Sequence, residues 1–348
     1  MLQKLGSQYL HLITAGGDGA VEQEIPTAES LELIRNVKLP KLTPGLRWLS
    51  SEQIFASTDM ERAIRALQRE LRSGLNPALD LKRNVLDVQH GQLFYMPSQF
   101  GEFVGVKVST VAPENPTVGK NRIQGIYILM DSITLSPILV LDGQALTTLR
   151  TPAVSASVAD LLAPTSVDHL VIFGTGIQAW GHVLAMGSIR SIERVTVVAR
   201  DQERGAKMIS RIQDSGLRAQ LGVDSDVRDA QIIVCATTAR APLFDGRLVP
   251  NQSLTVAMGT HEADAREIDS HLIARSQVIV EDPTVASKET GDIVIPLGEG
   301  CIVGSSLVPM RDIITGAVAV DLDRPRVFKS AGMPWEDLVI AAEIYRSL

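Results

Sequence analysis

The clearest indication of the fold is the segment DHLVIFGTGIQAWG, residues 168–181. A short apolar run ends directly in Gly174, Thr175 and Gly176, and Ala179 stands where a third glycine often occurs. In this arrangement the first glycine permits a tight turn and the second lets the backbone approach a pyrophosphate. The N-terminus of the following helix offers free N–H groups and a positive dipole end. We therefore predict a dinucleotide-binding turn; the alternative is a purely structural one.

The composition describes an ordinary globular protein, and at 348 residues two domains are expected. A net charge of −7 offers no basic surface for nucleic acid. Cys235 and Cys301 lie far apart without metal-ligand spacing, which predicts a reducing compartment, no disulfide and no metal site. No apolar run approaches the roughly 20 residues that span a bilayer, and the first residues lack a signal-peptide pattern. We expect a cytoplasmic protein that binds neither membranes nor nucleic acid.

The region before the glycine turn has a mixed pattern. Residues 1–45 are expected to form an N-terminal extension with turns and prolines, and a helix is predicted near 28–37. A capping box at Thr58 and Glu61 predicts an amphipathic helix that ends at Gly74. Alternating runs predict antiparallel or mixed strands, and a helix follows them over 147–162. The predicted strands are 93–96, 103–110, 125–131 and 137–142.

From residue 165 to about 320 the pattern alternates between strands and helices, which is typical of a parallel sheet. The expected fold class is α/β, with a Rossmann-type doubly wound parallel sheet and an N-terminal α+β domain. The expected domains are an extension, 1–45; a substrate-binding domain, 46–150; and a dinucleotide-binding domain, 151–325. A final amphipathic helix in 326–348 is expected to return to the first domain.

Six segments in order resemble the ornithine cyclodeaminase/mu-crystallin family, and together they cover about residues 46–348. They are GEFVGVKVSTVAPENP, ILVLDGQALTTLRTPAVSASVADLLA, VIFGTGIQA, GTHEADAREID, EDPTVASKETGDIV and RVFKSAGMPWEDLVIAA. The family includes ornithine and lysine cyclodeaminases, imine reductases acting on 1-pyrroline-2-carboxylate, amino-acid dehydrogenases and hormone-binding crystallins. The resemblance also implies a homodimer built through the sheet of the first domain.

Three cationic residues are candidates for holding a substrate carboxylate. Lys107 is a charge between apolar neighbours in a strand-like run, and Arg150 stands just before the dinucleotide-binding domain. Arginine grips a carboxylate with two parallel N–H bonds, while lysine adds a point charge. By resemblance, Arg83, Lys107 and Arg150 match the family's carboxylate ligands, and Met96 matches a methionine of the substrate pocket. The alternative is that these cations form surface or cross-domain salt bridges.

Two positions depart from the cyclodeaminases. His261 stands where they keep an aspartate for the substrate amine, and Phe94 stands where their pocket has a glutamate. Glu262 or Asp264 could substitute only with shifted geometry. These losses favour a reductase over a cyclodeaminase. His261 could donate a proton near neutral pH, or could simply be a polar residue that caps a turn.

The residues at the end of the second strand of the doubly wound sheet indicate which nicotinamide cofactor binds. An acidic residue there binds the ribose of NAD, whereas a nearby arginine accepts the 2′-phosphate of NADP. Ala199 occupies the acidic position and Arg200 follows, which favours NADP(H) over NAD(H); Asp201 is the counterargument. Thr237 and Thr238 are also expected to contact the cofactor, although they could equally be structural. The residues expected to contact the cofactor are Gly174, Thr175, Gly176, Ile177, Gln178, Arg200, Thr237, Thr238 and Met258.

The leading hypothesis is an NAD(P)H-dependent reductase of a cyclic α-imino acid of the 1-pyrroline-2-carboxylate or 1-piperideine-2-carboxylate type. Lys107 and His261 are its candidate catalytic residues. One alternative is ornithine cyclodeaminase, a lyase that converts L-ornithine to L-proline and ammonia with bound NAD. A third is an NADPH-dependent small-molecule binding protein that resembles the crystallins.

Overall fold

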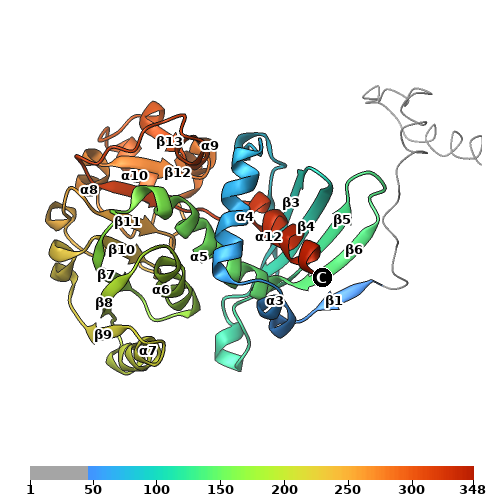
Figure 1. The fold of residues 1–348 in the computed structure, drawn as a ribbon, viewed down its shortest axis with the longest axis horizontal. Coiled ribbons are helices and arrows are strands. Elements are labelled where there is room, and N and C mark those ends of the chain that lie inside the picture. The colour runs from blue at the N-terminus through green and yellow to red at the C-terminus, as the bar shows by residue number, and fades with distance from the viewer. Residues whose placement is uncertain (1–45) are drawn as a thin grey trace, which may run out of the picture. The chain divides into compact units, whose positions relative to one another are not determined.

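The computed structural model describes residues 46–348, which build two β-sheets with helices packed on them (Figure 1). The predicted extension, 1–45, lies outside the described residues. Within 46–348 the first sheet has six strands and the second has eight. None of the helices in this range is long and apolar enough to span a membrane.

The six-stranded sheet has the order β1-β6-β5-β4-β3-β2 and is mixed, as predicted. Neighbouring strands are antiparallel from β2 to β6, and β1 pairs in parallel with β6. Every residue of β2 is exposed, so its sequence carries no alternating pattern. The strands are β1 (Arg47–Leu49), β2 (Asn84–Val88), β3 (Gly91–Phe100), β4 (Phe103–Val111), β5 (Ile123–Asp131) and β6 (Pro137–Asp142).

Four helices belong with this sheet: α3 (Ser51–Ser57), α4 (Met60–Arg72), α5 (Gly143–Leu162) and α12 (Pro334–Ser347). The predicted capping box at Thr58 is wrong by one residue. Asp59 caps α4 instead, because its side chain accepts the backbone N–H of Arg62 at 2.8 Å, while Thr58 ends α3. The last helix, α12, packs on β3, β4 and α4.

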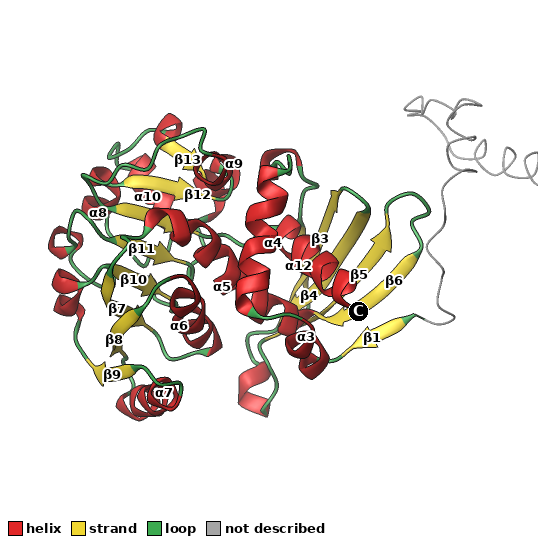
Figure 2. Cartoon of the chain, in the orientation of Figure 1, coloured by secondary structure: helices red, strands yellow, loops and turns green. Residues whose placement is uncertain are grey.

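The second sheet is entirely parallel, with the order β13-β12-β14-β11-β10-β7-β8-β9. Successive residues of β7 enter two different hydrophobic clusters, so both faces of the sheet are covered (Figure 2). The strands are β7 (Val167–Phe173), β8 (Ile192–Val198), β9 (Arg218–Leu221), β10 (Ile232–Cys235), β11 (Leu254–Ala257), β12 (Gln277–Val280), β13 (Leu307–Pro309) and β14 (Arg326–Lys329). The covering helices are α6 (Ile177–Ile189), α7 (Gln202–Asp214), α8 (Ser270–Arg275), α9 (Pro283–Glu289), α10 (Gly291–Gly298) and α11 (Met310–Thr315).

This topology confirms the Rossmann-type doubly wound fold. The chain runs outward through β7, β8 and β9, then turns back through β10 and β11 on the other side of β7. Ligands of such sheets bind beyond the carboxyl ends of the strands, at the point where the order reverses. That point lies between β7 and β10, directly after the glycine turn.

Two expected domain limits fall inside elements. The limit at 150 and 151 lies within α5, which continues to Leu162. The returning segment was expected from 326, but Arg326–Lys329 form β14 between β11 and β12. The strand is wholly buried and pairs on both edges, so it is part of the parallel sheet. The chain therefore leaves this sheet only after Lys329.

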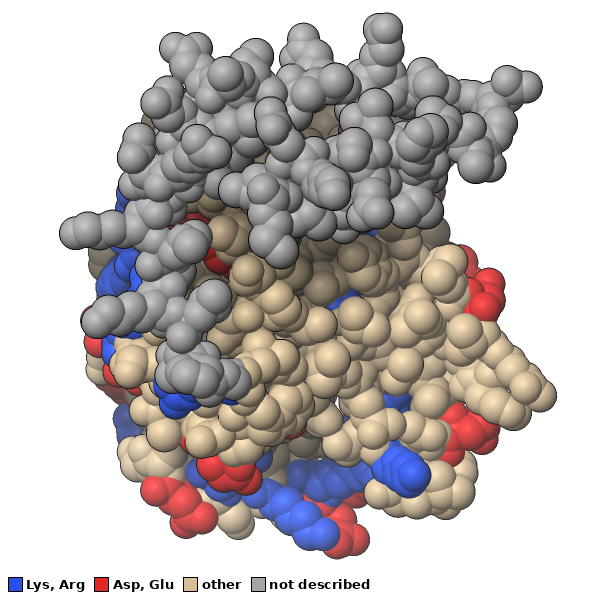
Figure 3. Space-filling view, turned by 90° about the vertical axis from the view of Figure 1, so that its right-hand side faces the viewer, with Lys and Arg blue, Asp and Glu red and all other residues tan. Residues whose placement is uncertain are grey.

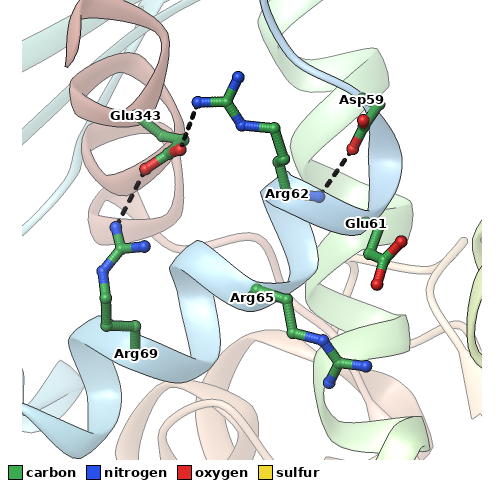
Figure 4. A pocket seen from close by; sticks show the side chains of 6 residues that line it. All are labelled: Asp59, Glu61, Arg62, Arg65, Arg69 and Glu343. Carbon is green, nitrogen blue, oxygen red and sulfur yellow. Dashed lines mark hydrogen bonds and ion pairs between the residues drawn. The ribbon is translucent and has the colours of Figure 1, made fainter. Parts of the chain in front are cut away.

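An ion-pair clasp seats α12 against α4 (Figure 4). Glu343 of α12 lies between Arg62 and Arg69 of α4, and each guanidinium approaches one carboxylate oxygen to 3.0 Å. The clasp fixes the helix whose first turn carries Glu336 and Asp337, two acidic residues of the candidate site.

Candidate functional site

The glycine turn is shaped to accept phosphate groups. Gly174 has a φ of 113°, and a Cβ there would lie 2.4 Å from the carbonyl oxygen of Ala236. Gly176 caps α6 without any side-chain hydrogen bond, and a Cβ on it would meet nothing within 4 Å. The first N–H groups of α6 therefore face open space, as a pyrophosphate-binding turn requires. These residues fit a dinucleotide.

Asp201, the acidic residue after β8, already accepts hydrogen bonds from the protein. The Asp201 side chain accepts the backbone N–H groups of Glu203 and Arg204 at 3.0 and 3.1 Å, which makes it the N-cap of α7. Arg200 is exposed and has no hydrogen bond or ion pair among residues 46–348. Its guanidinium is the unengaged charged group at this strand end.

Between the loops after β10 and β11 lies a buried acid that the sequence pattern did not indicate. Glu267 is fully buried and accepts the N–H and hydroxyl of Thr237 at 2.9 and 2.7 Å, and the N–H of Gly259 at 2.7 Å. Burial raises the pKa of Glu267, against the opposing effect of Lys329. The Glu267 carboxylate thus holds the loops after β10 and β11 together, while Thr238 is exposed and Met258 is buried.

A second missed feature is a completely buried ion pair. Lys329, at the end of β14, lies 2.9 Å from Asp292 at the start of α10, and neither side chain is exposed. The Lys329 ammonium also donates to the carbonyl oxygen of Thr260 at 2.7 Å. Asp292 in turn accepts the N–H groups of Glu267 and Ile268 at 2.7 and 3.0 Å. The pair therefore anchors the segment that presents His261.

The structure brings the three predicted cations together around the start of α12. The Lys107 ammonium lies 2.7 Å from Asp337 and 3.3 Å from the hydroxyl of Thr147. Arg150 lies 2.6 Å from Glu336 and 3.5 Å from Asp337.

Arg83 completes this cluster from the segment before β2. It donates to the carbonyl oxygen of Gly332 at 2.9 Å and forms an ion pair with Glu289. A Cβ on Gly332 would lie 3.0 Å from the Arg150 guanidinium. Position 332, three residues after the end of β14, must therefore stay small for Arg150 to reach its partners.

Lys107 keeps binding capacity for a further group. An ammonium carries three N–H donors, and two of them are used here. Burial lowers the pKa of Lys107, and the neighbouring Asp337 carboxylate opposes that effect. The ammonium is thus held in a low-dielectric site next to one carboxylate, with one donor left.

Met96 and Phe94 lie on the same face of the first sheet as Lys107. Met96 is directly opposite Lys107 in the β3–β4 pairing and is 5% exposed. Phe94 is two residues along β3, opposite Ser109, and is half-buried. Because side chains alternate along a strand, both project on the Lys107 side. They add apolar surface beside the cations.

His261 follows β11, and its side chain is accessible to solvent. Desolvation by the surrounding loops lowers the pKa of His261, and the positive charges of Lys329, Arg83 and Arg150 add to that effect. The imidazole is therefore neutral near neutral pH, where it can donate or accept a hydrogen bond. It makes none within the described residues.

The two acidic residues beside His261 are engaged elsewhere. Glu262 and Asp264 both pair with Arg240, which follows β10, and Asp264 does so at 2.6 Å. All three side chains are more than half exposed. Their exposure and their bonds to Arg240 give no support for either carboxylate replacing the missing aspartate.

The family model described as "Ornithine cyclodeaminase/mu-crystallin family" matches residues 48–348. The chain belongs to this family. It is 35% identical over 251 residues to a Delta(1)-pyrroline-2-carboxylate reductase of Bacillus cereus, covering 70% of this chain and 77% of that protein. It is also 33% identical over 224 residues to the mouse ketimine reductase mu-crystallin, covering 64% of this chain and 69% of that one.

A solved structure supports the same family assignment. It is the Delta(1)-pyrroline-2-carboxylate reductase of Thermococcus litoralis in complex with NADH and L-proline, with a TM-score of 0.80 and 25% identity. The match covers 86% of this chain and 96% of that one. The two folds therefore match over most of both chains.

Proposed function

We propose that this chain is an NAD(P)H-dependent reductase of a cyclic α-imino acid, of the 1-pyrroline-2-carboxylate or 1-piperideine-2-carboxylate type. The observation that carries the proposal is the convergence of Arg83, Lys107 and Arg150 in one cluster, beside apolar Met96 and Phe94. Three cations suit a carboxylate, and apolar side chains suit a ring without a side-chain amine. The relatives that carry this activity by name point the same way.

Each residue of the cluster has its own role in the proposed reaction. Arg150 and Arg83 bind and orient the carboxylate, which places the neighbouring imine carbon. The glycine turn would hold the pyrophosphate of a nicotinamide cofactor, which would supply the hydride when bound. Lys107 holds a proton at Nζ for the imine nitrogen, which must gain one as the amine forms. His261, as a neutral imidazole, offers a hydrogen bond rather than an imidazolium proton.

The test is a substrate screen with the purified protein. Cyclic imines with five- and six-membered rings are offered with NADPH and with NADH, and oxidation of the cofactor is followed by absorbance. Net oxidation that depends on the imine is expected. Formation of proline and ammonia from L-ornithine and NAD, without net NADH, would instead identify a cyclodeaminase. Tight ligand binding without turnover of any imine or amino acid would identify a binding protein.

The preferred cofactor is proposed to be NADP(H). Asp201 is used as a helix cap, whereas Arg200 has no partner in the part of the chain that the structure describes. A ribose 2′-phosphate would give Arg200 a charge-assisted hydrogen bond, which contributes about 1.5–3 kcal/mol.

Arg200→Ala is expected to raise the KM for NADPH roughly 10–100-fold and to leave the KM for NADH within about twofold. Initial rates at saturating imine measure both values. Arg218→Ala is the matched control, because Arg218 is equally exposed but pairs with Glu193 on another strand. An equal loss with both cofactors would show that Arg200 does not read the 2′-phosphate.

The chain is further proposed to form a homodimer through the first sheet. Figure 3 looks onto the side of this sheet and shows a broad uncharged surface with charged side chains towards its margins. The face opposite Lys107 carries exposed apolar residues on four strands, and a patch of this kind is typical of an interface. They are Trp48, Leu86, Tyr95 and Ile126, with exposed fractions of 51%, 55%, 45% and 39%.

Ile126→Glu is expected to raise the dimer dissociation constant at least about 100-fold, because it would bury an unpaired charge. Sedimentation velocity over a dilution series measures the change. Leu322→Glu is the control, since Leu322 is 58% exposed and lies outside this face. A dimer that tolerates Ile126→Glu as well as Leu322→Glu would place the interface elsewhere.

A further inference from the structure

One carboxyl oxygen in the cation cluster lacks a donor. Glu336 is completely buried, and its Oε2 accepts a hydrogen bond from Arg150 at 2.6 Å. Its Oε1 is also buried, and no donor reaches it within the described residues. A buried carboxylate oxygen left without a donor costs several kcal/mol, so such oxygens are rare in folded proteins.

A second buried carboxyl, that of Glu281 directly after β12, interacts with the Glu336 side chain. Glu281 is already an acceptor: Ser330 donates its hydroxyl at 2.7 Å, and Ala331 and Gly332 donate N–H groups at 2.7 and 3.0 Å. Since Glu281 already accepts from three donors, a proton shared between the two carboxyls would sit on Glu336. A protonated Glu336 could then donate to Glu281, which would remove the cost of its unpaired oxygen.

We propose that Glu336 carries this proton and is a positioning residue that keeps Arg150 available to the carboxylate of the substrate. The inference rests on the proposed function only for the identity of that substrate. With Glu336 neutral, the cluster sets three cations against three carboxylates. The cations are Arg83, Lys107 and Arg150, and the carboxylates are Glu281, Glu289 and Asp337. An ionised Glu336 would add a fourth negative charge directly on Arg150.

The electrostatic setting agrees with this arrangement. Burial raises the pKa of Glu336 well above its usual range, and the neighbouring Glu281 and Asp337 carboxylates add to the rise, against Arg150. The charged groups facing Glu336 come from five places: Arg150 on α5, Asp337 on α12, Glu281 after β12, Lys107 on β4 and Arg83 before β2.

Binding of a carboxylate ligand is expected to weaken as the pH rises. As pH rises through the pKa of Glu336, the lost proton leaves a negative charge beside Arg150, so a bound carboxylate is repelled more strongly. The dissociation constant of a carboxylate ligand therefore increases with pH. Pyrrole-2-carboxylate is a suitable probe, because it pairs a flat five-membered ring with a carboxylate that stays ionised above about pH 6.

The first measurement is infrared spectroscopy of the unliganded protein at about pH 7.5. We expect a carboxylic acid C=O band that is present in the wild type and lost in Glu336→Gln. In the difference spectrum between the two proteins, the bands of other buried acids such as Glu267 cancel. Glutamine has nearly the shape of the protonated acid, so this variant is expected to fold. A difference spectrum without the band would overturn the proposal.

The second measurement is calorimetric binding of pyrrole-2-carboxylate from about pH 7 to about pH 10. The wild-type dissociation constant is expected to rise about tenfold more than that of Glu336→Gln, because any loss of the Lys107 proton weakens binding equally in both proteins. Glu343→Gln is the matched control on the same helix, and it should follow the wild type. Equal slopes in wild type and Glu336→Gln would refute the role. Neither readout needs turnover, so failure to reduce any imine would count against the proposed function alone.

Discussion

Replacing Arg150 by alanine is expected to lower kcat/KM for the cyclic imine about 10²–10³-fold. Arg150 is 6% exposed and lies among the cations that face the proposed carboxylate. Its loss removes charge-assisted hydrogen bonds of about 1.5–3 kcal/mol each and the orientation that they impose. Steady-state kinetics with the preferred nicotinamide cofactor measure the change.

Two variants make the result specific. Arg150→Lys keeps the charge but not the planar fork, so an intermediate loss is expected. Arg65→Ala removes an arginine that is half exposed and pairs with Asp160 at 2.6 Å, and it should leave kcat/KM within about twofold. Cofactor binding and circular dichroism check that each variant is folded. Wild-type turnover by a folded Arg150→Ala would refute the carboxylate clamp.

Replacing Lys329 by methionine is expected to lower the free energy of unfolding by about 3–5 kcal/mol. The substitution leaves the Asp292 carboxylate buried without its cation, which is among the costliest single changes in a protein interior. It also removes the donor that reaches the carbonyl oxygen of Thr260, so the loop carrying His261 should loosen. Urea denaturation followed by circular dichroism measures the loss.

The matched control is the double variant Lys329→Met with Asp292→Asn. Asparagine keeps the oxygen that accepts the N–H groups of Glu267 and Ile268, but carries no charge. The double variant is expected to regain half or more of the lost stability. If both variants were equally unstable, the deficit would come from altered packing rather than from an unpaired charge.

The local features of the fold were predictable from the sequence. Strand β7, the glycine turn and α6 lie within about twenty residues, and each requirement of the turn is met by a residue type at a fixed offset. The exact start of α4 was not predictable, since Asp59 rather than Thr58 caps the helix. Both residues are good caps, and the choice depends on where α3 ends.

The site was predictable only in part. A charged residue inside an apolar run pointed to Lys107, and a position before the second domain pointed to Arg150. Glu267, Asp292 and Glu336 were missed, because acidic residues at helix starts and turns look like ordinary surface residues in a sequence. Their burial becomes visible only once the layers are packed.

Neighbours along the chain were enough to predict the doubly wound sheet and the dinucleotide turn, and the resemblance to the family gave the set of cations. The partners of those cations depend on how distant segments pack together. Lys107 and Asp337 are 230 positions apart, and Arg150 and Glu336 are 186 apart. Whether a charge is paired, buried or protonated depends on every element that packs around it, and here those elements come from both sheets.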